Sequence, residues 1–346
     1  MAAAARPVEL LIPRQFSSAT HGGPLPDGQV RALAGTTMGT TWSVQFVSHE
    51  PRDADAARAG IEALLRDLNA QLSHWDAGSA LGRYNRLPAG SWQAMPADFH
   101  AVLDAAAAIA VSSEGALDPT LGVLVNLWGY GPAGPRAATA ELPSEHQIAA
   151  ELARGGWARL QRQGAMLQQP GGLQLDFSAI AKGHAVDRVA GWLSNAGHVH
   201  HLVEIGGELR GQGVKPDGQP WWVALAPVAD DPRPVRIALD GLSVATSGDT
   251  WRHHEQAGKR LAHTLDPRTG SPLRNAAAAV TVIHPHCRAA DGWATALTVL
   301  GPDAGLQLAD QLGLAARWLM HADVEAGQGR VIASPAWLAM VETEAS

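Results

Sequence analysis

Strand-like and helix-like segments follow one another in this chain without a regular strand, helix, strand alternation. A doubly wound parallel sheet needs a helical crossover between paired strands, so this order favours a mostly antiparallel sheet with flanking helices. We therefore expect an α+β fold. The strand candidates are residues 41–47, 201–205, 221–226, 235–239, 243–246 and 279–284.

Apolar residues at helical spacing predict the helices that flank this sheet. Ser144 and Gln147 form a capping box that predicts a further short helix. Residues 173–177 alternate as a strand and lead directly into a helical stretch that Gly197 ends. The long predicted helices cover residues 61–72, 102–110, 178–196, 288–300 and 304–312.

The first 35 residues differ from the rest of the chain. They hold several prolines and glycines without apolar periodicity, which predicts an irregular N-terminal arm over residues 1–35. The remainder has no linker-like stretch in its middle and no internal repeat. We therefore expect residues 36–346 to form a single integrated domain.

Composition excludes several classes of protein. With 46% hydrophobic and 17% charged residues, the chain is an ordinary globular protein. Its 26 Lys and Arg against 33 Asp and Glu give a net charge of −7, so we expect no nucleic-acid partner. It has no apolar stretch of about 18 residues and no export signal or lipid-anchor cysteine at its start, so we expect a cytoplasmic protein without membrane insertion. Cys287 is the one cysteine, which rules out an intramolecular disulfide and a cysteine-based zinc site.

Four segments are denser in small, acidic and hydroxyl residues than core packing requires. The first, residues 115–131, contains Asp118-Pro119-Thr120 among four glycines. The Asp-Pro pair is consistent with a helix N-cap, whereas the glycines would let a ligand approach the backbone closely. Both interpretations stay open from this segment alone.

The second segment, residues 175–187, places Asp176 at the end of a predicted strand and Lys182 at the start of a predicted helix. Backbone N–H groups at a helix start attract phosphate, and a lysine adds positive charge, so the junction resembles a diphosphate seat. An ordinary helix cap with a surface lysine explains the same residues equally well.

The third segment surrounds a pair of glycines with Glu204 and Glu208, and residues 243–249 follow it. Glycines within strands mark a bulge or a place where another molecule meets the backbone. The two glutamates are candidates for acid and base chemistry, although carboxylates at strand edges are more often solvated.

The fourth segment combines residues 263–270 with residues 290–295. Asp291 and Thr295 are four positions apart, which puts a carboxylate and a hydroxyl on one face of a helix, as a hard cation such as Mg²⁺ requires. An exposed pair without a ligand is the alternative. His263 is one of 15 histidines, so by itself it is a weak candidate for a base.

Taken together in this order, the segments resemble the FAD:protein FMN transferase family, also called ApbE or flavin-trafficking proteins. The resemblance runs from about residue 38 to residue 313. The matching motifs are Met38-Gly-Thr40, Asp118-Pro-Thr-x-Gly with a following Asn-Leu-Trp-Gly, Leu175-Asp-Phe-x-x-Ile-Ala-Lys-Gly-x-Ala-Val-Asp187, Glu204-Ile-Gly-Gly-Glu208, Ala245-Thr-Ser-Gly-Asp249, His263-x-x-Asp266-Pro-x-Thr-Gly270 and Ala290-Asp-x-x-Ala-Thr295.

The resemblance implies a T-fold-like α+β structure and an Mg²⁺-dependent transferase. Such an enzyme cleaves the diphosphate of FAD, esterifies FMN to a Ser or Thr hydroxyl of an acceptor flavoprotein, and releases AMP. Phosphoryl transfer needs a cation, donors that hold the diphosphate and a base for the attacking hydroxyl, and the four segments supply residues of each type.

The resemblance also implies roles for individual residues. Asp291 and Thr295, with the backbone carbonyl of Ala179, would hold Mg²⁺, and Asp291 is thereby also catalytic. His263 would be the base for the acceptor hydroxyl. The residues that would line the FAD site are Met38, Trp75, Ala116, Leu117, Asp118, Asp176 and Lys182.

The chain departs from the family pattern in two places. Ser73-His74-Trp75 stands where the family has Ser-Thr-Tyr, so tryptophan would replace tyrosine on the flavin. Related proteins near respiratory complexes are commonly exported lipoproteins, and this chain has no such signal. Two alternatives share the same site: an Mg²⁺-dependent FAD diphosphatase that uses water, and a carrier that binds FAD without turnover.

Overall fold

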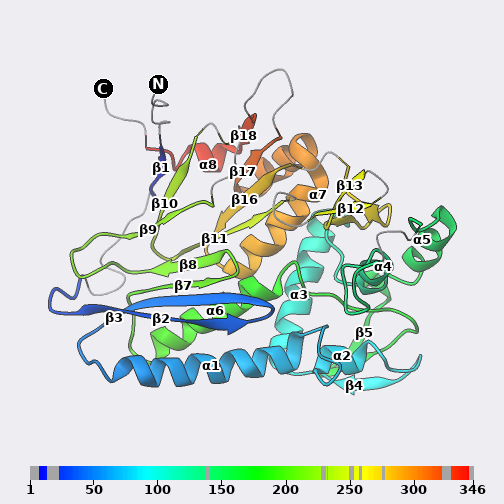
Figure 1. The fold of residues 1–346 in the computed structure, drawn as a ribbon, viewed down its shortest axis with the longest axis horizontal. Helices are drawn as coiled ribbons and strands as arrows, with labels where there is room; N and C mark the ends of the chain where they lie inside the picture. Colours follow the sequence, from blue (N-terminus) through cyan, green and yellow to red (C-terminus); the bar gives the residue numbers. More distant parts are fainter. Residues whose placement is uncertain are drawn as a thin grey trace.

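The computed structural model describes residues 8–13, 23–136, 141–226, 231, 233–248, 253–256, 259–274, 277–321 and 329–342. Within these residues, eight strands form one sheet in which every neighbouring pair is antiparallel (Figure 1). Across the sheet the strands are β18 (Val331–Ala333), β17 (Ala315–Leu319), β16 (Ala279–His284), β11 (Leu242–Ser247), β8 (Glu208–Gln212), β7 (His201–Ile205), β3 (Thr40–Ser48) and β2 (Gln29–Thr37).

Two long helices cover one face of this sheet and contact each other. α6 (Ala181–Asn195) packs on β7 and β8, and α7 (Cys287–Leu312) packs on β11 and β16. α1 (Asp53–Leu72) contacts α6 and β2, while α3 (Ala97–Ser112) contacts α7 (Figure 1). The α+β class with a mostly antiparallel sheet, expected from the sequence, is confirmed.

The opposite face of the sheet packs on a smaller sheet. This consists of β1 (Glu9–Leu11), β10 (Val235–Leu239) and β9 (Trp221–Ala224), and α8 (Pro335–Leu338) lies beside it. Strand alternation separates the two cores: on β11, Ala245 belongs to the core under the helices, whereas Val244 belongs to the core under the smaller sheet.

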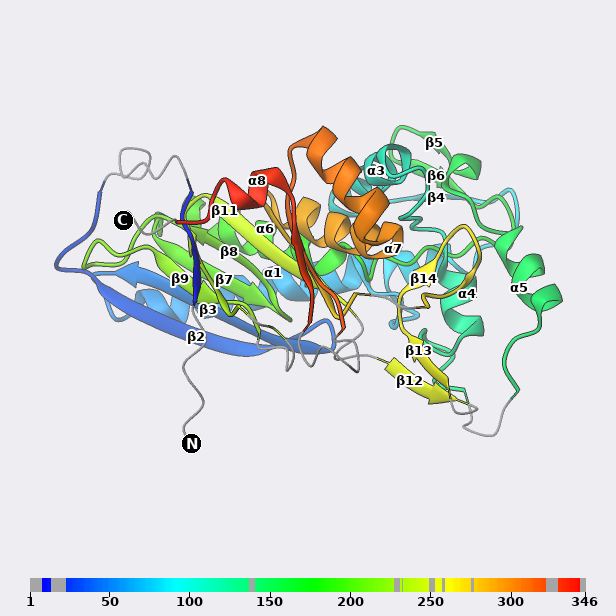
Figure 2. The ribbon, with the colours of Figure 1, turned by 90° about the horizontal axis from the view of Figure 1, so that it is seen from above.

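A group of small elements lies beyond α3 at one end of the molecule (Figures 1 and 2). The capping box of Ser144 and Gln147 starts α5, as predicted. The elements are α2 (Ala80–Tyr84), β4 (Trp92–Ala94), α4 (Gly122–Leu127), α5 (Glu145–Leu152), a 3₁₀ turn (Trp157–Arg159), β5 (Gln161–Gln163), β6 (Met166–Gln168), β12 (His253–Gln256), β13 (Lys259–Ala262), β14 (Leu265–Asp266) and β15 (Ser271–Pro272).

α7 contains the break that separates the two helical segments predicted from the sequence. Gly301 has φ +75° and Pro302 follows it. A residue with positive φ cannot continue an α-helix, and the ring of proline clashes with the preceding turn, so the helix changes direction here. The segment that carries Asp291 is therefore separate from the segment after the kink.

The prediction of an irregular arm over residues 1–35 needs correction where the structure describes it. β1 pairs in parallel with β10, and β2 pairs with β3 from Gln29 onward. β2 is an edge strand in which only Leu33 and Thr37 are buried, so it lacks the apolar pattern of a central strand. That residues 36–346 form one integrated domain stays a prediction.

Residues 173–177 alternate between buried and half-buried, as predicted, but they do not form a strand. Gln174 makes a parallel bridge to Leu121, and the chain beside it is a loop rather than a strand. α6 then begins at Ala181, three residues later than predicted. Among the described residues, no helix has the length and apolar character needed to cross a bilayer.

Candidate active site

The start of α6 and the first half of α7 bring Lys182 and Asp291 together. The Lys182 Nζ lies 3.9 Å from Oδ1 of Asp291 and 2.5 Å from Oε1 of Glu208, at the start of β8. Asp291 and Glu208 are 5% and 3% exposed, so two buried carboxylates share the ammonium group of Lys182, whose side chain is 23% exposed. Oε2 of Glu208 is buried without a hydrogen-bond partner in the described part of the chain.

Burial controls the protonation of this cluster. Burial raises the pKa of Asp291, whereas the charge of Lys182 and the hydrogen bond from the Gly183 N–H act to lower it. It also raises the pKa of Glu208 to about 8, against the attraction of Lys182. Burial would lower the pKa of Lys182, but the charges of Asp291 and Glu208 outweigh it and raise that pKa. A cation here would favour the ionised carboxylates.

The backbone of α6 meets Asp291 directly at Gly183. The Gly183 N–H donates to Oδ2 of Asp291 over 2.9 Å. In a regular helix this N–H would donate to the carbonyl of Ala179, but α6 begins only at Ala181, and the Ala179 carbonyl does not receive this bond. Among the backbone hydrogen bonds of the described residues, none ends on the Ala179 carbonyl.

A second group of predicted site residues surrounds the junction before α6. Oδ1 of Asp118 accepts from the backbone N–H and the hydroxyl of Thr120 over 2.8 and 2.6 Å. The N–H of Asp176 donates to the carbonyl of Pro119 over 2.8 Å, so the segments of Asp118 and Asp176 lie side by side. Of the two interpretations left open for Asp118, the helix N-cap is not found, because α4 begins at Gly122 with Leu121 as its N-cap.

The Asp176 carboxylate also reaches the Ser73-His74-Trp75 segment. Its Oδ2 lies 3.8 Å from Nε2 of His74, while Oδ1 accepts from the N–H of Ser178 over 2.7 Å. Trp75 is 62% exposed, the largest exposed fraction among the large apolar side chains described. Burial of Asp118 raises its pKa, with the bonds from Thr120 opposing the shift.

Met38 lies in the turn between β2 and β3, and the residue that follows this turn, Thr40, lies close to Lys182 across Gly206. Met38 has φ +48°, which is uncommon for a residue other than glycine. Thr40, at the start of β3, and the aliphatic chain of Lys182 both pack against Gly206, which has φ +62°. A side chain at position 206 would meet both, so glycine is needed for the turn to approach Lys182.

The remaining predicted residues differ in exposure. Ala116 and Leu117 are buried, with exposed fractions of 1% and 4%, so they would contribute mainly backbone atoms to the surface of a binding site. Thr295 is half-buried on α7, one turn after Asp291. His263 is half-buried between β13 and β14.

The segment around His263 packs on the residues after Asp118. The Tyr130 hydroxyl donates to the carbonyl of Ala262 over 3.0 Å, and Nε1 of Trp128 donates to the carbonyl of Gly270 over 2.8 Å. The first and fourth sequence segments are thus neighbours. Asp249, the last residue of the Ala245-Thr-Ser-Gly-Asp motif, lies outside the described residues.

Two residues of this site were not assigned a role from the sequence. Glu208 was a candidate for acid or base chemistry, with a solvated strand-edge carboxylate as the alternative, and it is buried against Lys182. Gly183 was part of a motif, and its close contact with α7 explains why it is glycine. A Cβ there would lie 2.4 Å from the carbonyl oxygen of Cys287. Glu204 accepts from Ser43 and Gly207 instead and supports the β7–β8 turn.

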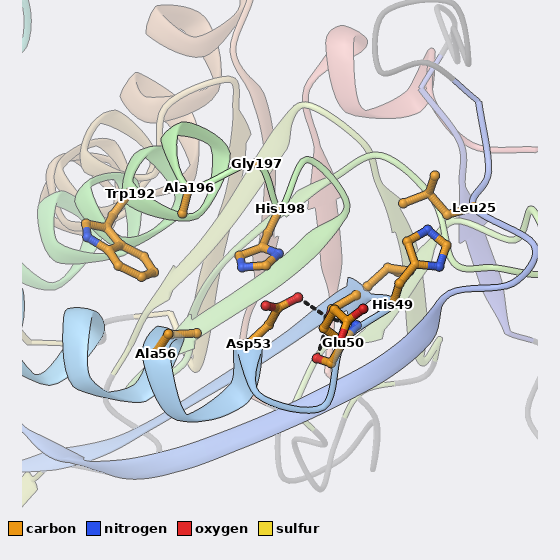
Figure 3. Close-up of a pocket in the computed structure, with 12 residues that line it drawn as sticks. Leu25, His49, Glu50, Asp53, Ala56, Trp192, Ala196, Gly197 and His198 are labelled. Atoms are coloured by element: carbon orange, nitrogen blue, oxygen red, sulfur yellow. Dashed lines mark hydrogen bonds between the residues drawn. The ribbon is translucent and has the colours of Figure 1, made fainter.

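A pocket of about 520 Å³ lies at the other end of α6 (Figure 3). It is lined by Asp53 at the start of α1 and by Trp192 and His198 at the end of α6. α6 has 15 residues and is about 22 Å long, so this pocket is separated from Lys182 by nearly the length of the helix. It is not part of the candidate site.

Comparison with known proteins gives the family. The FAD:protein FMN transferase of Vibrio cholerae is 37% identical over 80% of this chain and 84% of its own length, and that of Haemophilus influenzae is 35% identical over 85% and 88%. The crystal structure of the Pseudomonas stutzeri flavinyl transferase ApbE, apo form, is 39% identical, with a TM-score of 0.82 over 92% of this chain and 98% of that one. The flavin transferase ApbE of Vibrio cholerae is 33% identical, with a TM-score of 0.80 over 90% and 99%. The ApbE family model matches residues 38–318, which hold every site residue described above, and the chain belongs to the ApbE family.

Proposed function

We propose that this protein is an Mg²⁺-dependent FAD:protein FMN transferase. The observation that carries the proposal is the ion pair between Lys182 and the buried carboxylate of Asp291, at the point where α6 and α7 meet. An ammonium group and a metal-ligating carboxylate in one site suit a diphosphate substrate, because they offset its charge together. The names of the relatives support the same activity.

The residues at this junction suit a hard cation. The Asp291 carboxylate, the Ala179 carbonyl and the Thr295 hydroxyl are oxygen donors of the kind that Mg²⁺ binds in proteins. When bound, Mg²⁺ supplies charge that stabilises the diphosphate during its cleavage. Lys182, held by Glu208, adds a second positive charge that stays on the protein.

The proposed FAD site extends from Lys182 toward the exposed Trp75. Asp118, Asp176 and Met38, with the backbone of Ala116 and Leu117, would line it. Because the Trp75 ring is 62% exposed, most of its surface remains available to stack on a flat ring system. The acidic side chains suit hydroxyl and amino groups of the substrate rather than its phosphates.

The proposed reaction needs no reactant besides FAD and the acceptor hydroxyl. The oxygen of an acceptor Ser or Thr attacks the phosphorus of the FMN half, the bond from that phosphorus to the bridging oxygen breaks, and AMP leaves with the bridging oxygen. His263 accepts the proton of the attacking hydroxyl, the role that a histidine near neutral pH fills best. The acceptor is a flavoprotein with a Ser or Thr flavinylation motif.

The proposal is tested by incubating the purified protein with FAD and Mg²⁺, with and without such an acceptor, and separating the nucleotides by chromatography. We expect AMP only in the presence of acceptor, in equal amount to the FMN bound, and none after chelation. Equal AMP and free FMN without acceptor would establish a diphosphatase instead. Intact FAD in every sample would contradict both enzymes and favour a carrier.

A further inference from the structure

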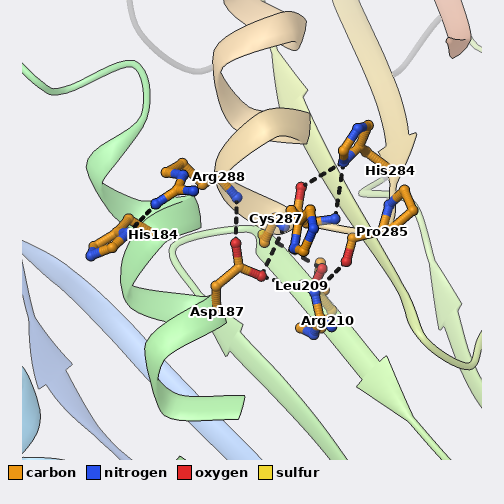
Figure 4. A network of polar contacts seen from close by, with 9 residues as sticks. His184, Asp187, Leu209, Arg210, His284, Pro285, Cys287 and Arg288 are labelled. Carbon is orange, nitrogen blue, oxygen red and sulfur yellow. Dashed lines mark hydrogen bonds and ion pairs between the residues drawn. The ribbon is translucent and has the colours of Figure 1, made fainter. Parts of the chain in front are cut away.

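The Asp187 carboxylate, on α6, binds the start of α7. Oδ1 accepts from the N–H of Cys287 over 2.9 Å, and Oδ2 accepts from the N–H of Arg288 over 3.0 Å (Figure 4). His286, the N-cap residue of α7, makes no side-chain capping bond. Asp187 therefore caps α7 from a different helix, 100 positions away in the sequence.

A third element is tied to the same carboxylate. Arg210, on β8, donates to Oδ1 of Asp187 over 3.0 Å and also to the carbonyl of Pro285, in the turn that leads into α7 (Figure 4). Asp187 and Arg210 are 19% and 17% exposed, so this pair is partly shielded from solvent. The start of α7 is thus held to both α6 and β8.

This contact and the one at the candidate metal site form a reciprocal pair. One turn before Asp187 on α6, the Gly183 N–H donates to Asp291, which lies one turn after Cys287 on α7. Each helix therefore gives a carboxylate to the backbone of the other, and residues four apart lie on one face of a helix. The position of Asp291 is fixed by both contacts.

We propose that Asp187 is a positioning residue for the metal site. It fixes the first turn of α7 against α6 and thereby places the Asp291 carboxylate at the start of α6, where the Gly183 N–H donates to it. Asp187 itself touches neither substrate nor metal. The inference rests on the proposed function, because it takes Asp291 as a metal ligand.

The test measures Mn²⁺ binding by electron paramagnetic resonance, with unfolding temperature recorded for each variant. Asp187→Asn keeps one oxygen acceptor but loses the charge, and we expect the Kd for Mn²⁺ to rise about 10- to 100-fold, as for other residues that orient metal ligands. The matched control is Asp231→Asn. Asp231 is buried and accepts from Arg317 on β17 over 2.7 Å, outside both α6 and α7, so its loss should lower the unfolding temperature without changing Mn²⁺ affinity.

A second variant separates positioning from simple helix capping. In Asp187→Asn with His286→Asp, the new carboxylate caps α7 locally but does not tie it to α6. We expect the unfolding temperature to recover while the Mn²⁺ Kd stays raised. Recovery of both would overturn the positioning role, as would an Asp187→Asn variant with wild-type affinity.

Failure of the inference is distinct from failure of the proposed function. If Asp291→Ala removes Mn²⁺ binding and Asp187→Asn leaves it unchanged, the metal site stands and the inference is wrong. If Mn²⁺ binds Asp291→Ala as tightly as the wild type, the metal site itself is wrong and the inference falls with it.

Discussion

The Gly183 backbone and the Asp291 side chain meet at a distance that excludes any larger residue at position 183. The N–H to Oδ2 distance is 2.9 Å, and a Cβ on Gly183 would lie 2.8 Å from the Cβ of Asp291. The close approach of α6 and α7 therefore depends on glycine at this position, and so does the direct bond between backbone and carboxylate.

Gly183→Ala is expected to destabilise the protein by about 1–3 kcal/mol, because the methyl group forces α6 and α7 apart. Gly191→Ala, on the same helix, is the control. Position 191 is exposed, and a Cβ there meets nothing within 4 Å, so alanine should stabilise the helix by about 0.5–1 kcal/mol. Urea unfolding of both variants measures the difference, and equal effects would contradict the packing described.

Asp291→Asn is expected to lower the rate of AMP release at least about 100-fold, since the side chain loses the charge that binds a cation. The amide oxygen can still accept from Gly183, so the fold should remain intact. The initial rate at saturating FAD and Mg²⁺, together with a circular dichroism spectrum, checks both parts. A folded variant that keeps more than a tenth of the activity would show that Asp291 is not a metal ligand.

Trp75→Ala is expected to weaken FAD binding about 10-fold, the loss expected when one stacking partner of a flat ring is removed. Because Trp75 is largely exposed, the unfolding temperature should not change. Trp75→Tyr should retain most of the affinity. Titration of FAD followed by quenching of flavin fluorescence measures the three affinities, and an unchanged Kd in Trp75→Ala would place the flavin elsewhere.

The stability of the protein is expected to fall below pH 6.5 in part because of His201 on β7. Burial lowers the pKa of His201 to about 4. In the unfolded chain histidine has a pKa near 6.5. Between pH 6.5 and 4 the unfolded chain therefore binds more protons than the folded protein, and the free energy of unfolding decreases as the pH falls. The contribution of His201 to the free energy of unfolding is fully present above pH 6.5, and it amounts to at most about 3 kcal/mol.

His201→Gln removes this titration, so the variant should lose less stability than the wild type between pH 7 and pH 4.5. His49→Gln, at an exposed position, serves as the control and should behave like the wild type. Urea unfolding at the two pH values gives the comparison. An equal loss in wild type and His201→Gln would show that His201 does not contribute.

Local patterns in the sequence were enough to predict the two helices that carry Lys182 and Asp291. The helical spacing before and after Gly301 gave both parts of α7, and the spacing of Asp291 and Thr295 gave their common face. The strand predicted from the alternation of residues 173–177 is wrong. These residues do alternate in burial, but the formation of a strand depends on whether another strand lies beside the segment.

Contacts between distant parts of the chain were not predictable in this way. Nothing near Glu208 in the sequence shows that it will be buried against Lys182, and nothing near Cys287 shows that its N–H will be capped by Asp187. β2 escaped prediction for a different reason: as an edge strand it buries few side chains and has a weak apolar pattern.

The central claim is that the site at the start of α6 and α7 transfers FMN to an acceptor hydroxyl. The most direct measurement is the intact mass of an acceptor flavoprotein after incubation with FAD, Mg²⁺ and this protein. We expect the acceptor to gain one FMN with the wild type, and to remain unmodified with Asp291→Asn, after chelation, or when its Ser or Thr is replaced by alanine. An unmodified acceptor with the wild type, alongside release of free FMN and AMP, would contradict the account.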